Sequence, residues 1–299
     1  MFKGIYTAII TPFRNGKVDE KKFEELLIGQ RNAGIKGVIP CGTTGEFLYL
    51  SEEEQQQIIE ISVSVCKGKA KVIPGTATLS IKETIAKTQE AQKKGADGVL
   101  IVTPWYIKPS QESLYKYYKE VAENVDLPII IYNNPSRTGV DISLETMEKL
   151  SSYKNIQGYK DSSSNLQRTT EFKCRLGNRF SLLAGNDDPL AAYLAMGGDG
   201  GILGISNLIP QTLTHLMEAW ETGDLKTFRD IWEKIFPLMT ALYLESIPYP
   251  LKYAMTLVHG VSPETRLPFG PLRESTQKAI ERELENLGLW KPLASVRER

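Results

Sequence analysis

The sequence predicts an α/β protein, a (β/α)8 barrel of the TIM type with a carboxyl-terminal helical appendage. Short apolar runs rich in β-branched residues alternate with amphipathic runs, and this strand–helix pair occurs eight times. The spacing of about 20 to 30 residues is what βαβ crossovers require. The strand runs are apolar on both faces, as in buried parallel sheets. Eight units in roughly 225 residues suit a closed barrel better than an open sheet.

The predicted strands are short, and each gives way to a turn that contains glycine, proline or polar residues. They are expected at residues 5–10, 37–40, 71–74, 98–102, 127–132, 155–160, 181–184 and 199–203. Helix-capping residues then begin the amphipathic runs. Asp19 and Ser110 are single caps, for helices to Asn32 and about Asn124, whereas Ser51 with Glu54 and Ser80 with Glu83 have the spacing of capping boxes. A further helix is expected at 143–152, another begins near Leu166, and a third ends at Met196. Residues 133–139 are expected to form a loop.

From Leu225 onward the pattern is helical, with expected breaks at Pro237, at 248–250 and at 268–271. Proline lacks a backbone N–H, so each of these positions is predicted to interrupt a helix. The chain shows no low-complexity linker before this region. We therefore expect a catalytic barrel at residues 1–224 and a helical region at 225–299 that packs on it.

The composition argues against several classes of partner. The chain has 36 acidic and 36 basic side chains among 299 residues, so no charge excess favours nucleic acid or a membrane surface. No apolar run approaches the roughly eighteen residues that a membrane span needs, and the apolar run at 5–10 is too short for a signal peptide. Three cysteines without close spacing indicate a reducing compartment, and we expect the cytoplasm.

The sequence offers little for metal or nucleotide chemistry. The histidines, His215 and His259, lie near or within the helical region, and neither zinc-ligand spacing nor a phosphate-binding glycine motif occurs. We therefore expect no metal and no separate cofactor. Cys41 precedes a Gly-Thr-Thr turn and is a possible nucleophile. Without a nearby histidine, a small buried residue at a strand end is the better interpretation.

Polar residues follow most of the predicted strands, and in a barrel the carboxyl ends of the strands meet at the active-site face. The residues brought together in this way are Thr43, Thr44, Tyr106, Tyr132, Arg137, Lys160, Asn186 and Ser206. Lys160 is central among them. Burial beside apolar or cationic groups lowers the pKa of a lysine amine by up to about 3–5 units, which makes it able to form an imine with a ketone. The alternative is an ordinary solvated lysine at a strand end.

The other candidates complete such a site. Tyr132, expected on the adjacent strand, is placed to move protons during imine formation, with a hydroxyl relay through Thr43 or Tyr106. The turn with Thr43 and Thr44 offers N–H groups and hydroxyls to a small carboxylate. Arg137 has the planar fork that suits a second carboxylate. For each, the alternative is structural: core packing for the tyrosine, an ordinary turn for the threonines and a surface side chain for the arginine.

The glycine-rich run at 197–201 precedes Ile202. Glycines let a backbone approach closely, so we expect the backbone at Ile202 to contact a ligand. A phosphate site near the last two strands of a barrel is the alternative, and no arginine or lysine lies close by in sequence to support it.

These residues resemble the dihydrodipicolinate synthase/N-acetylneuraminate lyase family, pyruvate-dependent class I aldolases on a (β/α)8 barrel. The likeness covers nearly the whole chain. It lies in Gly-Thr-Thr-Gly-Glu at 42–46, in Tyr132-Asn133 with Pro135, and in the strand-end Lys160. The runs at 103–110, 136–139 and 245–248 are similar to members that condense pyruvate with L-aspartate 4-semialdehyde to 4-hydroxy-tetrahydrodipicolinate, in lysine and diaminopimelate biosynthesis.

The resemblance implies a role for each residue. Lys160 forms the Schiff base with pyruvate, Tyr132 transfers protons, and Thr43 and Tyr106 complete the relay. Thr44 and the backbone of Ile202 hold pyruvate, and Arg137 holds the carboxylate of the aldehyde substrate. Because the matching tyrosine of the family reaches across a subunit boundary, the resemblance also implies a homodimer or homotetramer in which Tyr106 enters a neighbouring subunit.

Some positions depart from the family pattern. The chain has Asp-Ser-Ser-Ser at 161–164, and an Asp-Ser-Ser run also occurs in related sugar-acid aldolases. Ile247 stands where an asparagine is common, and Trp105 where a second tyrosine is common. Leu48, Glu52, Gln55 and Leu79 replace the polar set of lysine-inhibited members. The alternatives are therefore an aldolase or dehydratase for a 2-keto-3-deoxy sugar acid or sialic acid, and a barrel that binds without catalysis.

Overall fold

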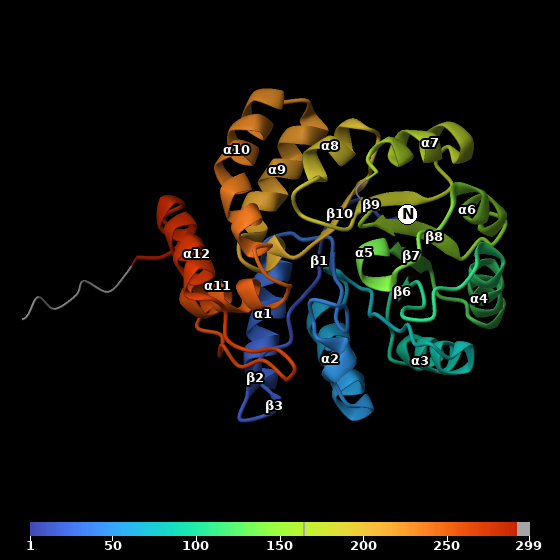
Figure 1. Ribbon diagram of the computed structural model, residues 1–299, viewed down its shortest axis with the longest axis horizontal. Helices are drawn as coiled ribbons and strands as arrows, with labels where there is room; N and C mark the ends of the chain where they lie inside the picture. Colours follow the sequence, from blue (N-terminus) through green and yellow to red (C-terminus); the bar gives the residue numbers. More distant parts are fainter. Residues whose placement is uncertain (164, 292–299) are drawn as a thin grey trace, which may run out of the picture.

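The computed structural model describes residues 1–163 and 165–291, and it contains the predicted barrel (Figure 1). Eight parallel strands form one sheet in the order β5-β4-β1-β10-β9-β8-β7-β6. A parallel bridge between Gly75 and Leu100 joins the two ends of this sheet. Each strand is therefore beside its neighbour in the chain, as in a (β/α)8 barrel, and the predicted fold class is confirmed.

The strands are close to the predicted ones. They are β1 (Gly4–Thr7), β4 (Gly37–Val38), β5 (Lys71–Val72), β6 (Val99–Val102), β7 (Ile129–Asn133), β8 (Ile156–Asp161), β9 (Ser181–Ala184) and β10 (Gly200–Leu203). The helices that follow them are α1 (Glu20–Asn32), α2 (Glu52–Cys66), α3 (Ile81–Lys93), α4 (Gln111–Asn124), α6 (Leu144–Leu150), α7 (Gln167–Leu176), α8 (Leu190–Ala195) and α9 (Pro210–Thr222).

Strand β7 shows how the core divides into two parts. Ile130 and Tyr132 belong to the cluster inside the barrel, whereas Ile129 and Ile131 belong to the larger cluster between strands and helices. Side chains alternate between the faces of a strand, so both faces of this strand are buried. This explains why the strand runs are apolar throughout.

The predicted caps account for where several helices begin. The side chain of Asp19 accepts a hydrogen bond from the N–H of Lys22, at the start of α1. Ser51 and Glu54 form the full reciprocal capping box of α2. At α3, the Ser80 side chain accepts from the N–H of Glu83. Each cap satisfies an N–H that has no partner within the helix.

Three features differ from the prediction. The expected loop at 133–139 contains a short helix, α5 (Pro135–Thr138), with a proline in its first turn and Gly139 at φ 72° as its C-cap. A hairpin of β2 (Phe13–Arg14) and β3 (Lys17–Val18) precedes α1. The predicted break at Pro237 is wrong, because Pro237 lies inside α10 (Leu225–Leu242). Packing of α10 against α9 and α12 (Glu274–Asn286) holds the helix together across the missing N–H.

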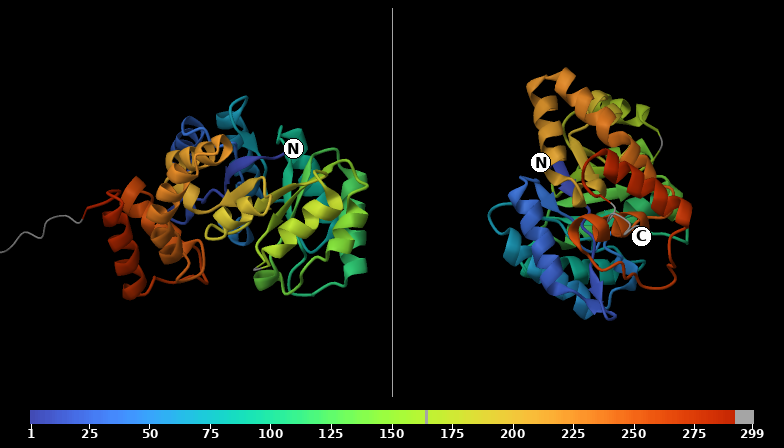
Figure 2. Two further views of the ribbon diagram at one scale, coloured as in Figure 1. Left: turned by 90° about the horizontal axis from the view of Figure 1, so that it is seen from above. Right: turned by 90° about the vertical axis from the view of Figure 1, so that its left-hand side faces the viewer.

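Beyond the barrel, α10, α11 (Tyr249–His259) and α12 gather on one side (Figures 1 and 2). The break expected at 248–250 coincides with the start of α11, and the one at 268–271 lies between α11 and α12. The division between the two regions at residue 224 stays a prediction. The last eight positions of the predicted helical region, 292–299, lie outside the described residues. None of the helices described is long and apolar enough to cross a membrane.

Candidate active site

A cavity of about 200 Å³ opens at the carboxyl ends of the barrel strands. The predicted residues that line it are Thr43, Thr44, Tyr132, Arg137, Lys160, Asn186 and Ile202. Chain segments that are far apart in sequence thus converge as barrel geometry requires. The predicted position of Ser206 is wrong. Its side chain is fully buried, and its hydroxyl donates to the carbonyl oxygen of Leu203 at 2.8 Å.

Lys160 lies near the end of β8 and is only 5% exposed. It is paired in register with Tyr132 on β7. The Lys160 Nζ lies 4.0 Å from the centre of the Tyr132 ring, within the range of a cation–π contact. The amine and the phenol ring are therefore neighbours inside the barrel, as the strand order predicts.

The phenol of Tyr132 has two partners that the sequence did not reveal. The Asn134 Nδ2 donates a hydrogen bond to the Tyr132 Oη at 2.7 Å, and the Ser162 Oγ lies 3.2 Å from the same oxygen. Both residues lie two positions after a predicted site residue, so they project from the same face of their strand ends. That spacing from Tyr132 and Lys160 was the signal that could have found them.

Tyr132 is 6% exposed. Burial by itself raises the pKa of a phenol. Here the positive charge of Lys160 and the hydrogen bonds with Ser162 and Asn134 outweigh burial, so that the pKa of Tyr132 is below its usual value. The surroundings of this side chain favour giving up its proton.

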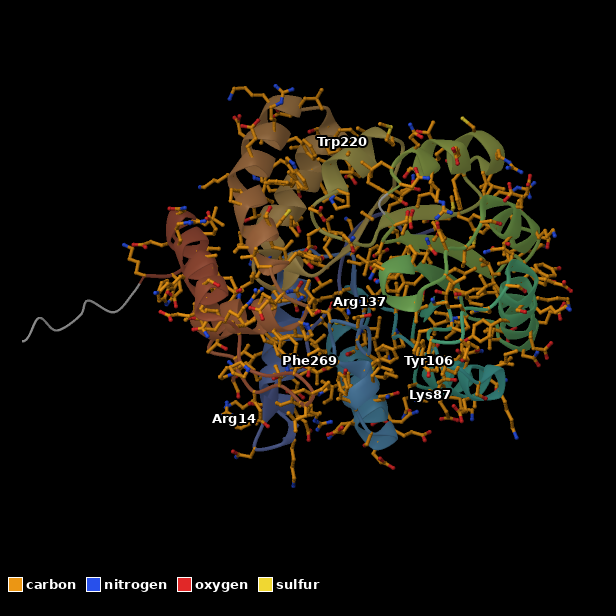
Figure 3. The ribbon with its side chains drawn as sticks, in the orientation of Figure 1. Arg14, Lys87, Tyr106, Arg137, Trp220 and Phe269 are labelled. Carbon is orange, nitrogen blue, oxygen red and sulfur yellow. The ribbon has the colours of Figure 1, made fainter. Side chains whose placement is uncertain are left out.

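Tyr106 lies away from this cavity within the single chain. Its side chain is 88% exposed and its backbone adopts a positive φ of 70°. Figure 3 shows it apart from Arg137, which lies at the cavity on α5. The relay through Tyr106 is therefore not assembled by one chain, and its entry into a neighbouring subunit stays a prediction.

The turn with Thr43 and Thr44 is anchored from below by Glu46. The N–H of Glu46 donates to the carbonyl oxygen of Thr43 at 3.1 Å, and Glu46 adopts a positive φ of 58°. Its fully buried carboxylate pairs with the equally buried Lys252 on α11. The Lys252 Nζ also lies 4.2 Å from the centre of the Phe13 ring. A charge from the helical region is thus packed directly beneath the turn.

Cys41 lies at the cavity but is 2% exposed. Burial raises the pKa of its thiol to about 12. A thiol needs to ionise to act as a nucleophile, so the environment of Cys41 favours the small buried residue over the nucleophile.

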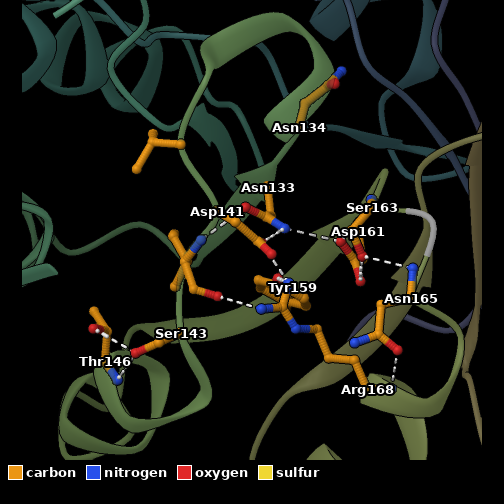
Figure 4. A network of polar contacts seen from close by, with 12 residues as sticks. Asn133, Asn134, Asp141, Ser143, Thr146, Tyr159, Asp161, Ser163, Asn165 and Arg168 are labelled. Carbon is orange, nitrogen blue, oxygen red and sulfur yellow. Dashed lines mark hydrogen bonds and ion pairs between the residues drawn. The ribbon is translucent and has the colours of Figure 1, made fainter. Parts of the chain in front are cut away.

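A polar network supports the two strand ends from outside the barrel (Figure 4). The Asn133 Nδ2 donates to Asp161 at 3.0 Å and to Asp141 at 2.7 Å. Arg168 on α7 donates to Asp141 at 2.5 Å and to the carbonyl oxygen of Ile142 at 2.8 Å. Asn133 follows Tyr132 and Asp161 follows Lys160, so the network ties together the backbones that carry the two inward side chains.

The serine run after Asp161 is divided between the faces of the strand end. Ser163 faces outward, and its hydroxyl donates to the Asp161 Oδ2 at 2.9 Å. Ser162 faces Tyr132. Ser164, the last residue of the predicted run, lies outside the described residues. The unusual run thus has at least two distinct contacts.

Asp187 supports the end of β10. Its carboxylate is fully buried and accepts hydrogen bonds from the N–H groups of Gly204 at 2.8 Å and Ile205 at 3.1 Å. Burial raises the pKa of Asp187 to about 6, although the two N–H groups act in the opposite direction. This acceptor shapes the turn that follows Ile202.

Packing accounts for the glycine-rich run. A Cβ at Gly200 would lie 2.0 Å from the carbonyl oxygen of Gly4 on β1, and one at Gly198 would lie 2.3 Å from the ring of Tyr193. Gly200 thus allows β10 to lie close to β1, and Gly198 allows the chain to pass close to Tyr193 of α8. A ligand contact at the backbone of Ile202 stays a prediction.

Arg137 is exposed on α5, on the rim of the cavity, with Ser136 beside it. Its guanidinium is therefore open to a ligand. Within the described part of the chain, no group of three or more histidine, cysteine, aspartate or glutamate side chains is arranged to hold a metal ion.

Comparison with known proteins identifies relatives along the full barrel. A model of the dihydrodipicolinate synthetase family matches residues 1–287. A 4-hydroxy-tetrahydrodipicolinate synthase of Syntrophus aciditrophicus (strain SB) is 41% identical over 289 residues, which are 97% of this chain and 99% of the relative. The enzyme of the same name from Fervidobacterium nodosum is 40% identical over 290 residues, 97% of this chain and 99% of the relative.

Solved structures are equally similar. Dihydrodipicolinate synthase from Aquifex aeolicus superimposes with a TM-score of 0.94 at 37% identity, covering 98% of this chain and 100% of that one. The Thermotoga maritima enzyme gives 0.93 at 37% identity, with 97% and 99% covered. A structure described as the first monomeric dihydrodipicolinate synthase variant gives 0.93 at 36% identity, with 96% and 97% covered. The chain therefore belongs to the dihydrodipicolinate synthetase family.

Proposed function

We propose that the protein is a lyase that condenses pyruvate with L-aspartate 4-semialdehyde to 4-hydroxy-tetrahydrodipicolinate, through a Schiff base on Lys160. The observation that carries this proposal is the buried Lys160 amine, 4.0 Å from the centre of the Tyr132 ring inside a cavity of about 200 Å³. Relatives named for this reaction, about 40% identical over nearly the whole chain, support the choice of substrates.

The chemistry assigns a task to each group. The Lys160 amine adds to the keto carbon of pyruvate, and the Tyr132 phenol gives a proton to the resulting hydroxyl, which leaves as water. Loss of a proton from the methyl carbon converts the imine into an enamine. The enamine carbon then attacks the aldehyde, and ring closure by the amine of the product releases Lys160. The reaction needs no metal and no separate cofactor in this scheme.

The substrates are held by charge and by backbone. Thr44 and the backbone at Ile202 bind the carboxylate of pyruvate, since both line the cavity with Lys160. Thr43 serves the relay of Tyr132. Arg137, exposed on the rim, binds the carboxylate of the aldehyde. A guanidinium matches a carboxylate with two parallel hydrogen bonds.

The proposal includes an assembly and a compartment. Tyr106 and Ile107 are 88% and 61% exposed, which supports a homodimer or homotetramer in which Tyr106 enters a neighbouring subunit. The alternative is a monomer, as in the monomeric variant among the similar structures. Sedimentation of the purified protein distinguishes a monomer from a dimer or tetramer. The cysteines Cys41, Cys66 and Cys174 are unpaired, which supports the cytoplasm.

The test of the reaction is direct. Purified protein with pyruvate and L-aspartate 4-semialdehyde is expected to yield the cyclic product, detected by mass spectrometry. In parallel, the protein is given 2-keto-3-deoxy sugar acids and sialic acid, and released pyruvate is measured. Cleavage of one of these acids without formation of the cyclic product would overturn the proposal.

Replacing Arg137 by lysine separates the two substrates. A lysine keeps the charge but loses the paired hydrogen bonds, so the KM for the aldehyde is expected to rise about tenfold or more. The KM for pyruvate is expected to stay the same, because pyruvate is held by other groups. Steady-state kinetics with each substrate varied in turn checks this. An equal rise in both KM values would contradict the assignment.

A further inference from the structure

The phenol of Tyr132 is held by two polar side chains of its own subunit. The Asn134 amide nitrogen and the Ser162 hydroxyl contact the Tyr132 oxygen at 2.7 Å and 3.2 Å. Both side chains are nearly buried, at 5% and 7% exposure. The contact is therefore sheltered from competing water.

The neighbouring residues show that this arrangement is built. The side-chain Oδ1 of Asn134 accepts a hydrogen bond from the Ser136 hydroxyl at 2.9 Å, which turns the Asn134 Nδ2 toward Tyr132. On the other side, a Cβ at Gly185 would lie 2.2 Å from the Ser162 Oγ. The absence of a side chain at Gly185 leaves the space that the serine hydroxyl occupies.

Asn134 and Ser162 both stabilise the phenolate form of Tyr132. The amide nitrogen of Asn134 can only donate to the phenol oxygen. The Ser162 hydroxyl can accept from the neutral phenol, but toward a phenolate it can only donate. Once Tyr132 has given up its proton, both groups therefore donate to the oxygen, and hydrogen bonds to a charged oxygen are the stronger kind.

We propose that Ser162 and Asn134 are positioning residues that hold the Tyr132 phenol beside Lys160 and stabilise its phenolate during imine formation. This inference rests on the proposed function. The family resemblance implies that Tyr106 of a neighbouring subunit assists Tyr132. In this proposal, residues of the same chain as Tyr132 provide part of that assistance. Tyr106 itself is 88% exposed in the single chain.

Other charged or titratable groups also face Tyr132. They are Lys160 on β8, Arg137 on α5 and Tyr243 just beyond α10. The lowered pKa of Tyr132 has Lys160 as its largest favourable cause, with Ser162 and Asn134 next. Because these groups share the cavity with the phenol, the experiment includes a background without the phenol.

The experiment measures kcat/KM for pyruvate against pH in the wild type, Ser162→Ala and Asn134→Leu. Because Tyr132 acts as a proton donor, loss of one hydrogen-bond donor to its oxygen raises its pKa, so that the descending limb is expected to move upward by about one pH unit. The less stabilised phenolate is expected to cost about tenfold in kcat/KM near neutral pH. Ser62→Ala is the matched control. Ser62 is a fully buried serine of α2 whose hydroxyl donates to the carbonyl oxygen of Ile58, and its profile is expected to match the wild type.

A double-mutant cycle isolates the contact. In a Tyr132→Phe background, Ser162→Ala is expected to have no further effect on kcat/KM, because its partner oxygen is gone. Equal losses from Ser162→Ala with and without the phenol would overturn the proposal, as would an unshifted limb. Thermal unfolding of each variant checks that the fold is kept.

Failure of this inference is distinguishable from failure of the proposed function. Wild-type protein is treated with pyruvate and borohydride. If Lys160 gains the reduced adduct while the kcat/KM profile of Ser162→Ala matches that of the wild type, the inference fails and the Schiff-base chemistry stands. If the wild type gains no adduct, the proposed function fails.

Discussion

Replacing Lys160 by alanine is expected to abolish imine formation. The side chain is 5% exposed at the cavity and lies beside the Tyr132 ring, and the alanine variant has no amine to attack pyruvate. Removing a covalent nucleophile typically costs at least about 10⁴-fold in turnover. Turnover is measured with both substrates, and the adduct is measured by mass spectrometry after borohydride reduction with pyruvate.

Two companion variants make this result specific. Lys160→Arg keeps a positive charge beside Tyr132 but forms no imine, so it is expected to be as inactive as the alanine variant. Lys154→Ala removes an exposed lysine just before the same strand and is expected to trap pyruvate normally. An adduct that survives in Lys160→Ala, on any other lysine, would contradict the assignment.

Replacing Lys252 by methionine is expected to destabilise the fold by about 3–5 kcal/mol. The change leaves the Glu46 carboxylate buried without its partner, since both side chains have almost no exposure. It also removes the hydrogen bond to the carbonyl oxygen of Glu264 at 3.1 Å. Unfolding by guanidinium chloride, followed by circular dichroism, measures the loss.

The control for Lys252 is an exposed pair of the same kind. Lys226 and Asp230 pair on α10 with 87% and 61% exposure, so Lys226→Met is expected to cost less than about 1 kcal/mol. The double variant Glu46→Gln with Lys252→Met removes both charges and is expected to recover part of the lost stability. If Lys252→Met costs no more than Lys226→Met, the buried pair has no special role.

The barrel was predictable because its determinants are local. Periodicity and helix caps located strands and helices to within a few residues, and barrel geometry then placed Lys160 and Tyr132 together. The short helix α5 was missed because Pro135 and Gly139 are typical of turns and of helix ends alike.

The contacts that remained hidden depend on register and on distant packing. The approach of Ser162 to Tyr132 requires the pairing of β7 with β8. The pairing of Glu46 with Lys252 joins two segments that lie far apart in the chain. No local pattern marks either contact, because each side chain alone is compatible with an ordinary turn or helix.

The pairing of Glu46 with Lys252 also limits how relatives can recombine. A chimera that takes its barrel from one parent and its last helices from another inherits the two charges from different genes. When both parents carry the acid and the base, the junction near residue 224 is expected to be tolerated. When the parent that supplies the barrel lacks the acid, or the parent that supplies the helices lacks the base, the hybrid buries the remaining ion without a partner beneath the substrate-binding turn. Libraries of shuffled family members should therefore be screened first for matched residues at these two positions.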